Sequence, residues 1–91
     1  MMINFFKMRF YYVYVLLEKN RQLYTGFTAD LKRRIDEHIR GKVVSTRNRG
    51  LLKLIYYEAY RNKRDAEKRE RYLKTTKGKR TLKLQLHNYL K

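Results

Sequence analysis

Glu70 stands in an unusual place for a carboxylate in this 91-residue sequence. With Ala66 and Leu73 it follows an i, i+4, i+7 spacing, so on a helix its side chain points toward the core. A buried carboxylate is unfavourable unless it is paired or binds a metal ion. The simpler interpretation is an i, i+4 ion pair with Lys74 on the helix surface, and the sequence leaves both open.

Arg34 and His38 are also polar residues that lie beside an apolar helix stripe. They are four residues apart and border the apolar stripe of Leu31 and Ile35, so both flank a core rather than open water. A histidine in such a place is by default a hydrogen-bonded packing residue. Tyrosines on strands, such as Tyr14 and Tyr24, are by default core aromatics with a wet hydroxyl. Taken together, the five side chains could converge on a phosphate group.

The first half of the chain offers a hairpin and a helix to position these residues. Residues 10–17 are aromatic and β-branched, which predicts a strand, and a central one because both of its faces are apolar. Residues 18–21 predict a turn, and 22–27 a second strand that ends near Gly26. Residues 30–40 form a helix with Ile39 beside its apolar stripe, capped by Thr28 or Asp30 and closed by Gly41.

The second half continues with a basic loop over residues 41–50 and a third strand over 51–60. Asn62 and Asp65 resemble a capping box that starts a helix running to about Thr75. Residues 76–79, which contain Gly78, predict a break. The rest of the chain has leucines that alternate as in a strand, but the longer apolar set that shares one helical face favours a third helix. The order β-β-α-β-α-α predicts an α+β domain: a small three-stranded antiparallel sheet flanked by three helices.

A site that uses both tyrosines depends on how the two strands of the hairpin pair. Tyr14 and Tyr24 share a face of the sheet only if the two strands pair with an even register sum, for example residue 16 opposite residue 24. A slip of one residue would place them on opposite faces and break the site.

Composition narrows the class of protein. The chain has 24 Lys+Arg against 8 Asp+Glu, a formal net charge of +16, so it needs an anionic partner. The absence of cysteine excludes disulfides, thiolate zinc sites and cysteine nucleophiles. No apolar run approaches the ~20 residues of a membrane-spanning helix, and the run at residues 10–17 lacks a signal-peptide cleavage site. We therefore expect a cytoplasmic protein, with a flexible lead-in at residues 1–9 and a single domain over 10–91.

The charge is concentrated toward the C-terminal part. Residues 61–83 hold eleven lysines and arginines against three acids. Such a surface is either a solvated helix face or a footprint for a phosphate backbone, and the imbalance of signs favours the footprint.

The spacing of these residues resembles the GIY-YIG nuclease superfamily. Tyr12–Val13–Tyr14 is followed ten residues on by Tyr24–Thr25–Gly26, then by Arg34 and by His38, and later by a glutamate-bearing helix with Glu70. The likeness spans about residues 10–75. It is greatest to small stand-alone bacterial members related to the N-terminal endonuclease domain of the excinuclease UvrC.

The resemblance implies the roles of the site residues. Tyr14 and Tyr24 would be the motif tyrosines, and Arg34 would bind phosphate. Glu70 would be the ligand of one divalent metal ion, Mg²⁺ or Mn²⁺, which polarises the phosphoryl oxygen. Tyr24 is the favoured general base and His38, near the scissile phosphate, its rival. Expected substrate contacts come from Gly26, Arg47, Arg49, Arg69 and Lys74.

The activity implied is metal-dependent hydrolysis of DNA phosphodiester bonds, in DNA repair or on branched DNA. The alternative is a non-catalytic or weakly active nucleic-acid-binding module of the same fold, because no asparagine follows Glu70 near Thr81, where family members often carry one. DNA is favoured over RNA as the partner. We expect recognition by shape or charge, or targeting by a partner protein, because a chain this short offers no obvious second binding domain.

Overall fold

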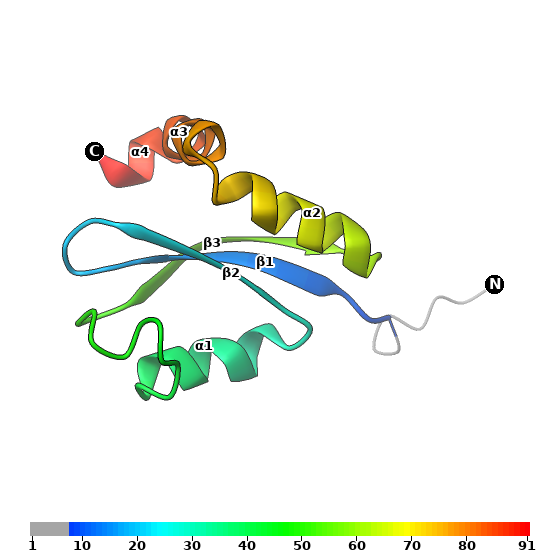
Figure 1. Ribbon diagram of the computed structural model, residues 1–91, viewed down its shortest axis with the longest axis horizontal. Coiled ribbons are helices and arrows are strands. Elements are labelled where there is room, and N and C mark those ends of the chain that lie inside the picture. Colours follow the sequence, from blue (N-terminus) through cyan, green and yellow to red (C-terminus); the bar gives the residue numbers. More distant parts are fainter. Residues whose placement is uncertain (1–7) are drawn as a thin grey trace.

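The computed structural model of the protein, described over residues 8–91, has one antiparallel sheet between two helical layers (Figure 1). Most of the predicted lead-in, residues 1–7, lies outside the described part. The elements are β1 (Tyr11–Leu17), β2 (Leu23–Thr28), α1 (Leu31–Ile39), β3 (Lys53–Tyr60), α2 (Lys63–Leu73), α3 (Thr76–Gln85) and α4 (His87–Leu90). The strand order is β2-β1-β3, which confirms that the first strand is central.

The two faces of the sheet have different partners. α1 lies on one face, and α2, α3 and α4 lie on the other (Figure 1). Val13 and Val15 of β1 pack against the second layer, where the fully buried residues Ala66, Leu73 and Leu82 complete the core. Alternation along the strand then turns Tyr14 and Leu16 toward α1, and both are buried as well.

The pairing of β1 with β2 has the register that places Tyr14 and Tyr24 on the same face of the sheet. Leu16 lies opposite Tyr24, and Tyr14 lies opposite Gly26. Since Tyr14 and Leu16 are two residues apart, Tyr14 and Tyr24 share one face of the sheet. The pairing of β1 with β3 contains a register shift between Val15 and Leu16, whereas the pairing of the same residues with β2 is regular.

Local signals set the ends of α1. The Asp30 side chain accepts a hydrogen bond from the Arg33 backbone N–H at 3.2 Å, so Asp30 is the cap, and Thr28 instead bonds to the backbone of Asp30. At the other end Gly41 adopts a φ of 74°, the left-handed conformation that closes a helix. Ile39, expected beside the buried stripe, is 67% exposed because it lies at the end of the helix, away from the sheet.

The predicted break at residues 76–79 is wrong. Thr75 caps α3 by accepting a hydrogen bond from the Gly78 backbone N–H at 3.0 Å, so the helix already begins at Thr76. Gly78 lies in its first turn, where a Cβ would stand 1.9 Å from the Tyr72 carbonyl oxygen. This glycine permits close approach of α2 and α3 rather than ending a helix. The last predicted helix is also divided, since Leu86 separates α3 from the single turn of α4.

Candidate active site

Three aromatic rings from three elements meet between the sheet and α1. Tyr14 comes from β1, Tyr24 from β2 and His38 from α1. The ring centroid of His38 lies 5.5 Å from that of Tyr14 and 5.2 Å from that of Tyr24, and the two tyrosine centroids are 6.5 Å apart. The hairpin register and the position of His38 on α1 therefore bring together three residues that are spread over 24 positions of the sequence.

A chain of hydrogen bonds runs through the buried histidine. The Tyr14 hydroxyl lies 2.7 Å from Nε2 of His38, and the Thr46 hydroxyl lies 2.8 Å from Nδ1. All three residues are almost completely buried. Whichever ring nitrogen carries the hydrogen, the other accepts one, so the network holds a neutral imidazole in a fixed orientation.

Thr46 and its neighbour Ser45 were not expected from the sequence. They belong to the loop between α1 and β3, which shows only as a basic segment in the sequence. The Ser45 hydroxyl donates to the Tyr24 hydroxyl at 3.2 Å, so consecutive loop residues hold two of the three rings. A threonine in a polar loop carries no sequence signal for burial, and only its tertiary contact identifies it.

Gly26 is required by the Tyr14 side chain. A Cβ at residue 26 would lie 2.3 Å from both Cζ and Oη of Tyr14, far inside contact distance. The tyrosine ring therefore lies over the glycine of the opposite strand and extends from the central strand toward the edge strand, β2. Glycine at this position gives the phenol its place in the site.

Burial controls the ionisation of the rings. Burial raises the pKa of Tyr14 to about 12, with smaller contributions from Tyr24 and Glu70, while a hydrogen bond from Arg34 and its charge act in the opposite direction. Burial and then the charge of Arg34 lower the pKa of His38 below its ordinary value of 6.5, and Glu37 partly opposes them. Tyr14 is therefore a neutral phenol and His38 a neutral imidazole near pH 7.

Arg34 joins this group from one turn before His38. Its guanidinium lies beside the Tyr14 hydroxyl, and it pairs with Glu37 at 3.1 Å. The arginine side chain is 37% exposed. The group therefore has a cation at its solvent-facing side that can reach an anionic ligand.

Glu70 reaches the same environment from the opposite helical layer. Its side chain is 21% exposed, between the buried Ala66 and Leu73, and its Oε2 lies 3.1 Å from Nζ of Lys74. The two interpretations of the sequence thus coexist, since the carboxylate is largely buried and also ion-paired. Its charge acts on Tyr14, so α1 and α2 contribute to one electrostatic field around that hydroxyl.

A metal ion would find a single carboxylate here. Residues 8–91 contain no group of three or more His, Cys, Asp or Glu side chains that could hold an ion. Mg²⁺ is commonly held by one or two carboxylates, several waters and substrate phosphate. Glu70, a single largely buried carboxylate on a helix rich in lysine and arginine, fits such a cation, provided that Lys74 turns away.

The remaining predicted contacts lie outside this group. Arg47 is exposed on the loop after α1. Arg49 pairs with the buried Glu18 at 3.2 Å. Arg69 makes a two-pronged contact with Glu58 at 3.0–3.2 Å, and Glu58 also accepts from Tyr56 and Tyr60. This largely buried cluster, unexpected from the sequence, joins α2 to β3.

Comparison with known proteins identifies the family of the chain. The GIY-YIG catalytic domain family matches residues 10–83. The chain belongs to the GIY-YIG family. It is also a UPF0213 protein, being 49% identical over 76 residues to a UPF0213 protein of Clostridium perfringens, a match that covers 82% of this chain and 80% of the relative.

Further UPF0213 relatives extend the comparison to a solved structure. A UPF0213 protein of Pediococcus acidilactici is 36% identical over 81 residues, covering 86% of this chain and 83% of that one. The solution NMR structure of a UPF0213 protein from Bacillus halodurans is 37% identical, with a TM-score of 0.53 over 80% of this chain and 81% of that one. The predicted GIY-YIG resemblance and α+β fold are confirmed. In residues 8–91 no helix is long and apolar enough to cross a membrane.

Proposed function

We propose that this GIY-YIG protein is a metal-dependent endonuclease that hydrolyses DNA phosphodiester bonds. The observation that carries the proposal is the position of the Tyr14 hydroxyl. It is hydrogen-bonded to His38 at 2.7 Å, lies over Gly26 and is within the influence of both Arg34 and Glu70. A packing tyrosine does not require an arginine and a histidine hydrogen-bonded to its hydroxyl.

Arg34 and Glu70 bind opposite charges in this proposal. The Arg34 guanidinium forks onto the oxygens of the scissile phosphate and stabilises the charge that develops there. Glu70 would hold one divalent cation, Mg²⁺ or Mn²⁺, in place of its ion pair with Lys74. When bound, that cation supplies Lewis-acid polarisation of the phosphoryl oxygen. Lys74, once released, is placed to contact the phosphate backbone.

Tyr24 is the favoured residue to receive a proton from the attacking water, a step in which its phenolate oxygen would be the acceptor and the neutral phenol would form. Tyr14 is 1% exposed and His38 is 2% exposed, whereas Tyr24 is only partly buried. A general base must come within hydrogen-bond distance of the proton it removes, and Tyr24 is the ring that solvent reaches. His38 is the rival, since its neutral Nε2 could accept the proton through the Tyr14 hydroxyl.

The charged surface supports DNA as the substrate class. A net charge of +16 attracts a polyanion, and Arg47 on the exposed loop is available to contact its backbone. Backbone contacts position a protein on nucleic acid without reading sequence. We therefore propose recognition by shape or charge in DNA repair or on branched DNA, with any further specificity supplied by a partner protein.

Nicking of supercoiled plasmid with and without Mg²⁺ tests the proposal. We expect metal-dependent nicking by the unaltered protein, and a loss of at least 100-fold in Arg34→Ala and Glu70→Ala, of the order seen for removal of one transition-state contact. Glu67→Ala, on the same helix, is the matched control and should nick normally. A protein that binds DNA but never nicks it would instead favour the non-catalytic module.

A further inference from the structure

Glu58 on β3 is a carboxylate whose two oxygens are both occupied by neighbouring side chains. It accepts hydrogen bonds from the hydroxyls of Tyr56 and Tyr60 and from the Arg69 guanidinium, whose nitrogens lie 3.0–3.2 Å away. The glutamate side chain is 14% exposed. Burial by itself raises the pKa of Glu58, but the bonds from Arg69 and the two tyrosines lower it below its ordinary value. The glutamate is therefore ionised and fully paired near pH 7.

These contacts join three elements of the fold. Arg69 belongs to α2, and Gln85 of α3 is included because its side-chain amide donates to the Tyr56 hydroxyl at 3.0 Å. We refer to Tyr56, Glu58, Tyr60, Arg69 and Gln85 as the Glu58 cluster. A guanidinium that holds a carboxylate through two nitrogens fixes direction as well as distance. The cluster therefore fixes α2 against the edge strand β3 at residue 69.

Glu70 follows Arg69 directly on α2. Consecutive residues of an α-helix point about 100° apart, so the rotation of α2 that brings Arg69 to Glu58 also sets the direction of Glu70. The fully buried Ala66 and Leu73 hold α2 against the core, but burial of apolar surface is non-directional. The directional contact next to Glu70 is the ion pair of Arg69.

The two arginines that flank Glu70 have different surroundings. Arg69 is 28% exposed and is bound to Glu58. Arg71 is exposed, and within residues 8–91 it takes part in no ion pair. If both arginines served only as surface charge, they would not differ in this way. The structure therefore offers a pair of neighbours in which the charge is the same and the attachment is not.

We propose that Arg69, held by Glu58, is a positioning residue that directs the Glu70 carboxylate toward a bound divalent metal ion. The inference rests on the proposed function for the role of Glu70 as the metal ligand. Arg69 does not touch the metal ion itself. Residues that orient a metal ligand through its surroundings change metal affinity by about 10–100-fold when they are substituted.

Positioning and simple electrostatics predict opposite effects for the loss of Arg69. Arg69→Gln removes a cation beside Glu70 and leaves the charge of Glu58 without its partner. By Coulomb attraction alone, a divalent cation should then bind more tightly. If Arg69 positions Glu70, the same substitution weakens metal binding. Arg71→Gln is the matched control, because it removes the same charge on the other side of Glu70 and breaks no ion pair among residues 8–91.

Mn²⁺ binding measured without DNA tests the proposal and needs no cleavage. Paramagnetic broadening of the backbone amide resonances of residues 69–73 gives an apparent Kd, and Glu70→Gln establishes that the broadening depends on this carboxylate. We expect Arg69→Gln to raise the Kd at least about tenfold, and Arg71→Gln to leave it unchanged or lower it. Arg69→Lys keeps the charge without the two-pronged contact, so it should give a smaller loss and serves if Arg69→Gln does not fold.

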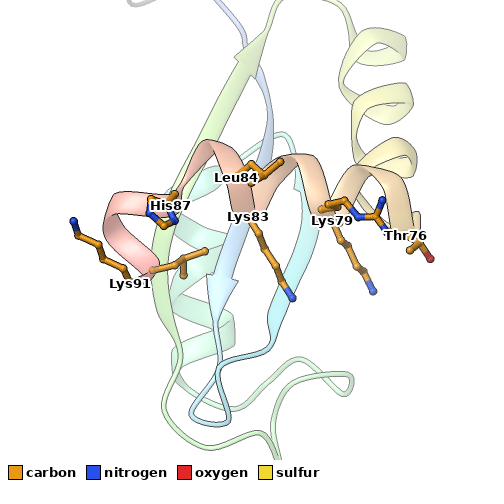
Figure 2. A pocket seen from close by; sticks show the side chains of 8 residues that line it. Thr76, Lys79, Lys83, Leu84, His87 and Lys91 are labelled. Carbon is orange, nitrogen blue, oxygen red and sulfur yellow. The ribbon is translucent and has the colours of Figure 1, made fainter.

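Two further variants separate positioning from stability and from net charge. Glu18→Gln breaks a second ion pair of a buried carboxylate, with Arg49 at 3.2 Å, so it should lower the melting temperature without weakening Mn²⁺ binding. Lys83→Gln removes a charge from the hollow along α3 and α4 (Figure 2), whose lining contains no member of the Glu58 cluster. This variant should change neither the melting temperature nor the Kd for Mn²⁺.

Three results would overturn the proposal. They are an unchanged or lower Kd in both Arg69 variants, an equal rise in Kd in Arg69→Gln and either Arg71→Gln or Glu18→Gln, and the absence of Mn²⁺ broadening on α2 in the unaltered protein. If the unaltered protein binds Mn²⁺ at Glu70 but never nicks DNA, the proposed function fails, whereas a selective loss of Mn²⁺ binding in the Arg69 variants still supports positioning.

Discussion

The Tyr14 hydroxyl lies 2.7 Å from Nε2 of His38, between the central strand and the helix that covers one face of the sheet. This hydrogen bond is buried, and the second ring nitrogen of His38 is also bonded, to Thr46. The phenol and the imidazole therefore serve both the stability of the fold and the proposed chemistry. Their two roles can be separated by substitutions that remove single groups.

Tyr14→Phe removes the hydroxyl and leaves the buried Nε2 of His38 without its partner. We expect the free energy of unfolding to fall by about 1–3 kcal/mol, the cost of an unsatisfied buried polar group. Urea denaturation measures this loss. Tyr12→Phe, on the same strand and only half-buried, is the control and should change the free energy of unfolding by less than about 0.5 kcal/mol. Equal losses in the two variants would show that the Tyr14 hydroxyl has no special role.

Thr46 is a positioning residue for His38, and two substitutions distinguish this role from simple packing. Thr46→Val keeps the shape and removes the hydroxyl that bonds to Nδ1. We expect it to lose about 1 kcal/mol of stability and to change the ¹⁵N resonances of the His38 ring. Thr46→Ser should restore those resonances together with nicking. Normal ring resonances in Thr46→Val would contradict the assignment.

Gly26→Ala introduces a methyl group where Tyr14 already lies. The Cβ would be 2.3 Å from the end of the phenol, so the ring must move, at a cost of about 1–3 kcal/mol. The same substitution in a Tyr14→Leu background should cost less, because the obstructing atoms are gone. A double-mutant cycle measures this coupling. Additive losses would mean that the clash is relieved elsewhere.

The depressed pKa of His38 predicts a specific pH dependence of stability. In the unfolded chain the histidine takes up a proton as the pH falls through about 6.5, whereas the folded protein keeps it neutral to lower pH. The unfolded state therefore binds more protons, and stability falls as the pH drops from about 7 to 5. His38→Gln should weaken this dependence, as followed by melting temperature. A carboxylate such as Glu58, whose pKa is lowered below 4.5, affects only more acidic conditions.

Arg69 is expected to act in stability more than in substrate binding. Its guanidinium is held by Glu58 and is 28% exposed. Arg69→Ala should cost about 2 kcal/mol, less than the 3–5 kcal/mol for a fully buried pair, and Glu58→Gln in the same chain should recover part of the loss. The salt slope of DNA binding should change by less than the ~0.9 of one phosphate contact. If Arg69→Ala reduced the salt slope of DNA binding by the full amount for one phosphate contact and left stability unchanged, Arg69 would instead be a DNA-binding residue.

The sequence by itself determined the elements and most of the candidate site. The aromatic and β-branched run at residues 10–17 predicted the central strand, and the motifs that contain Tyr14, Tyr24, Arg34 and His38 resembled the GIY-YIG family, to which the chain belongs. These features are local, because periods of two and 3.6 residues decide which side chains share a face.

Only the tertiary structure decided which polar residues hold the site and which cations are free. Thr46 is hydrogen-bonded to His38, and Glu58 forms an ion pair with Arg69. Both contacts join parts of the chain that are separate in sequence. In the sequence Gly78 predicts a helix break, whereas in the structure its missing side chain leaves room for the backbone of Tyr72. Lysines and arginines look alike in a charge count, and their roles follow from the carboxylates that folding brings within reach. That selection leaves Lys79 and Lys83 without an ion-pair partner among residues 8–91.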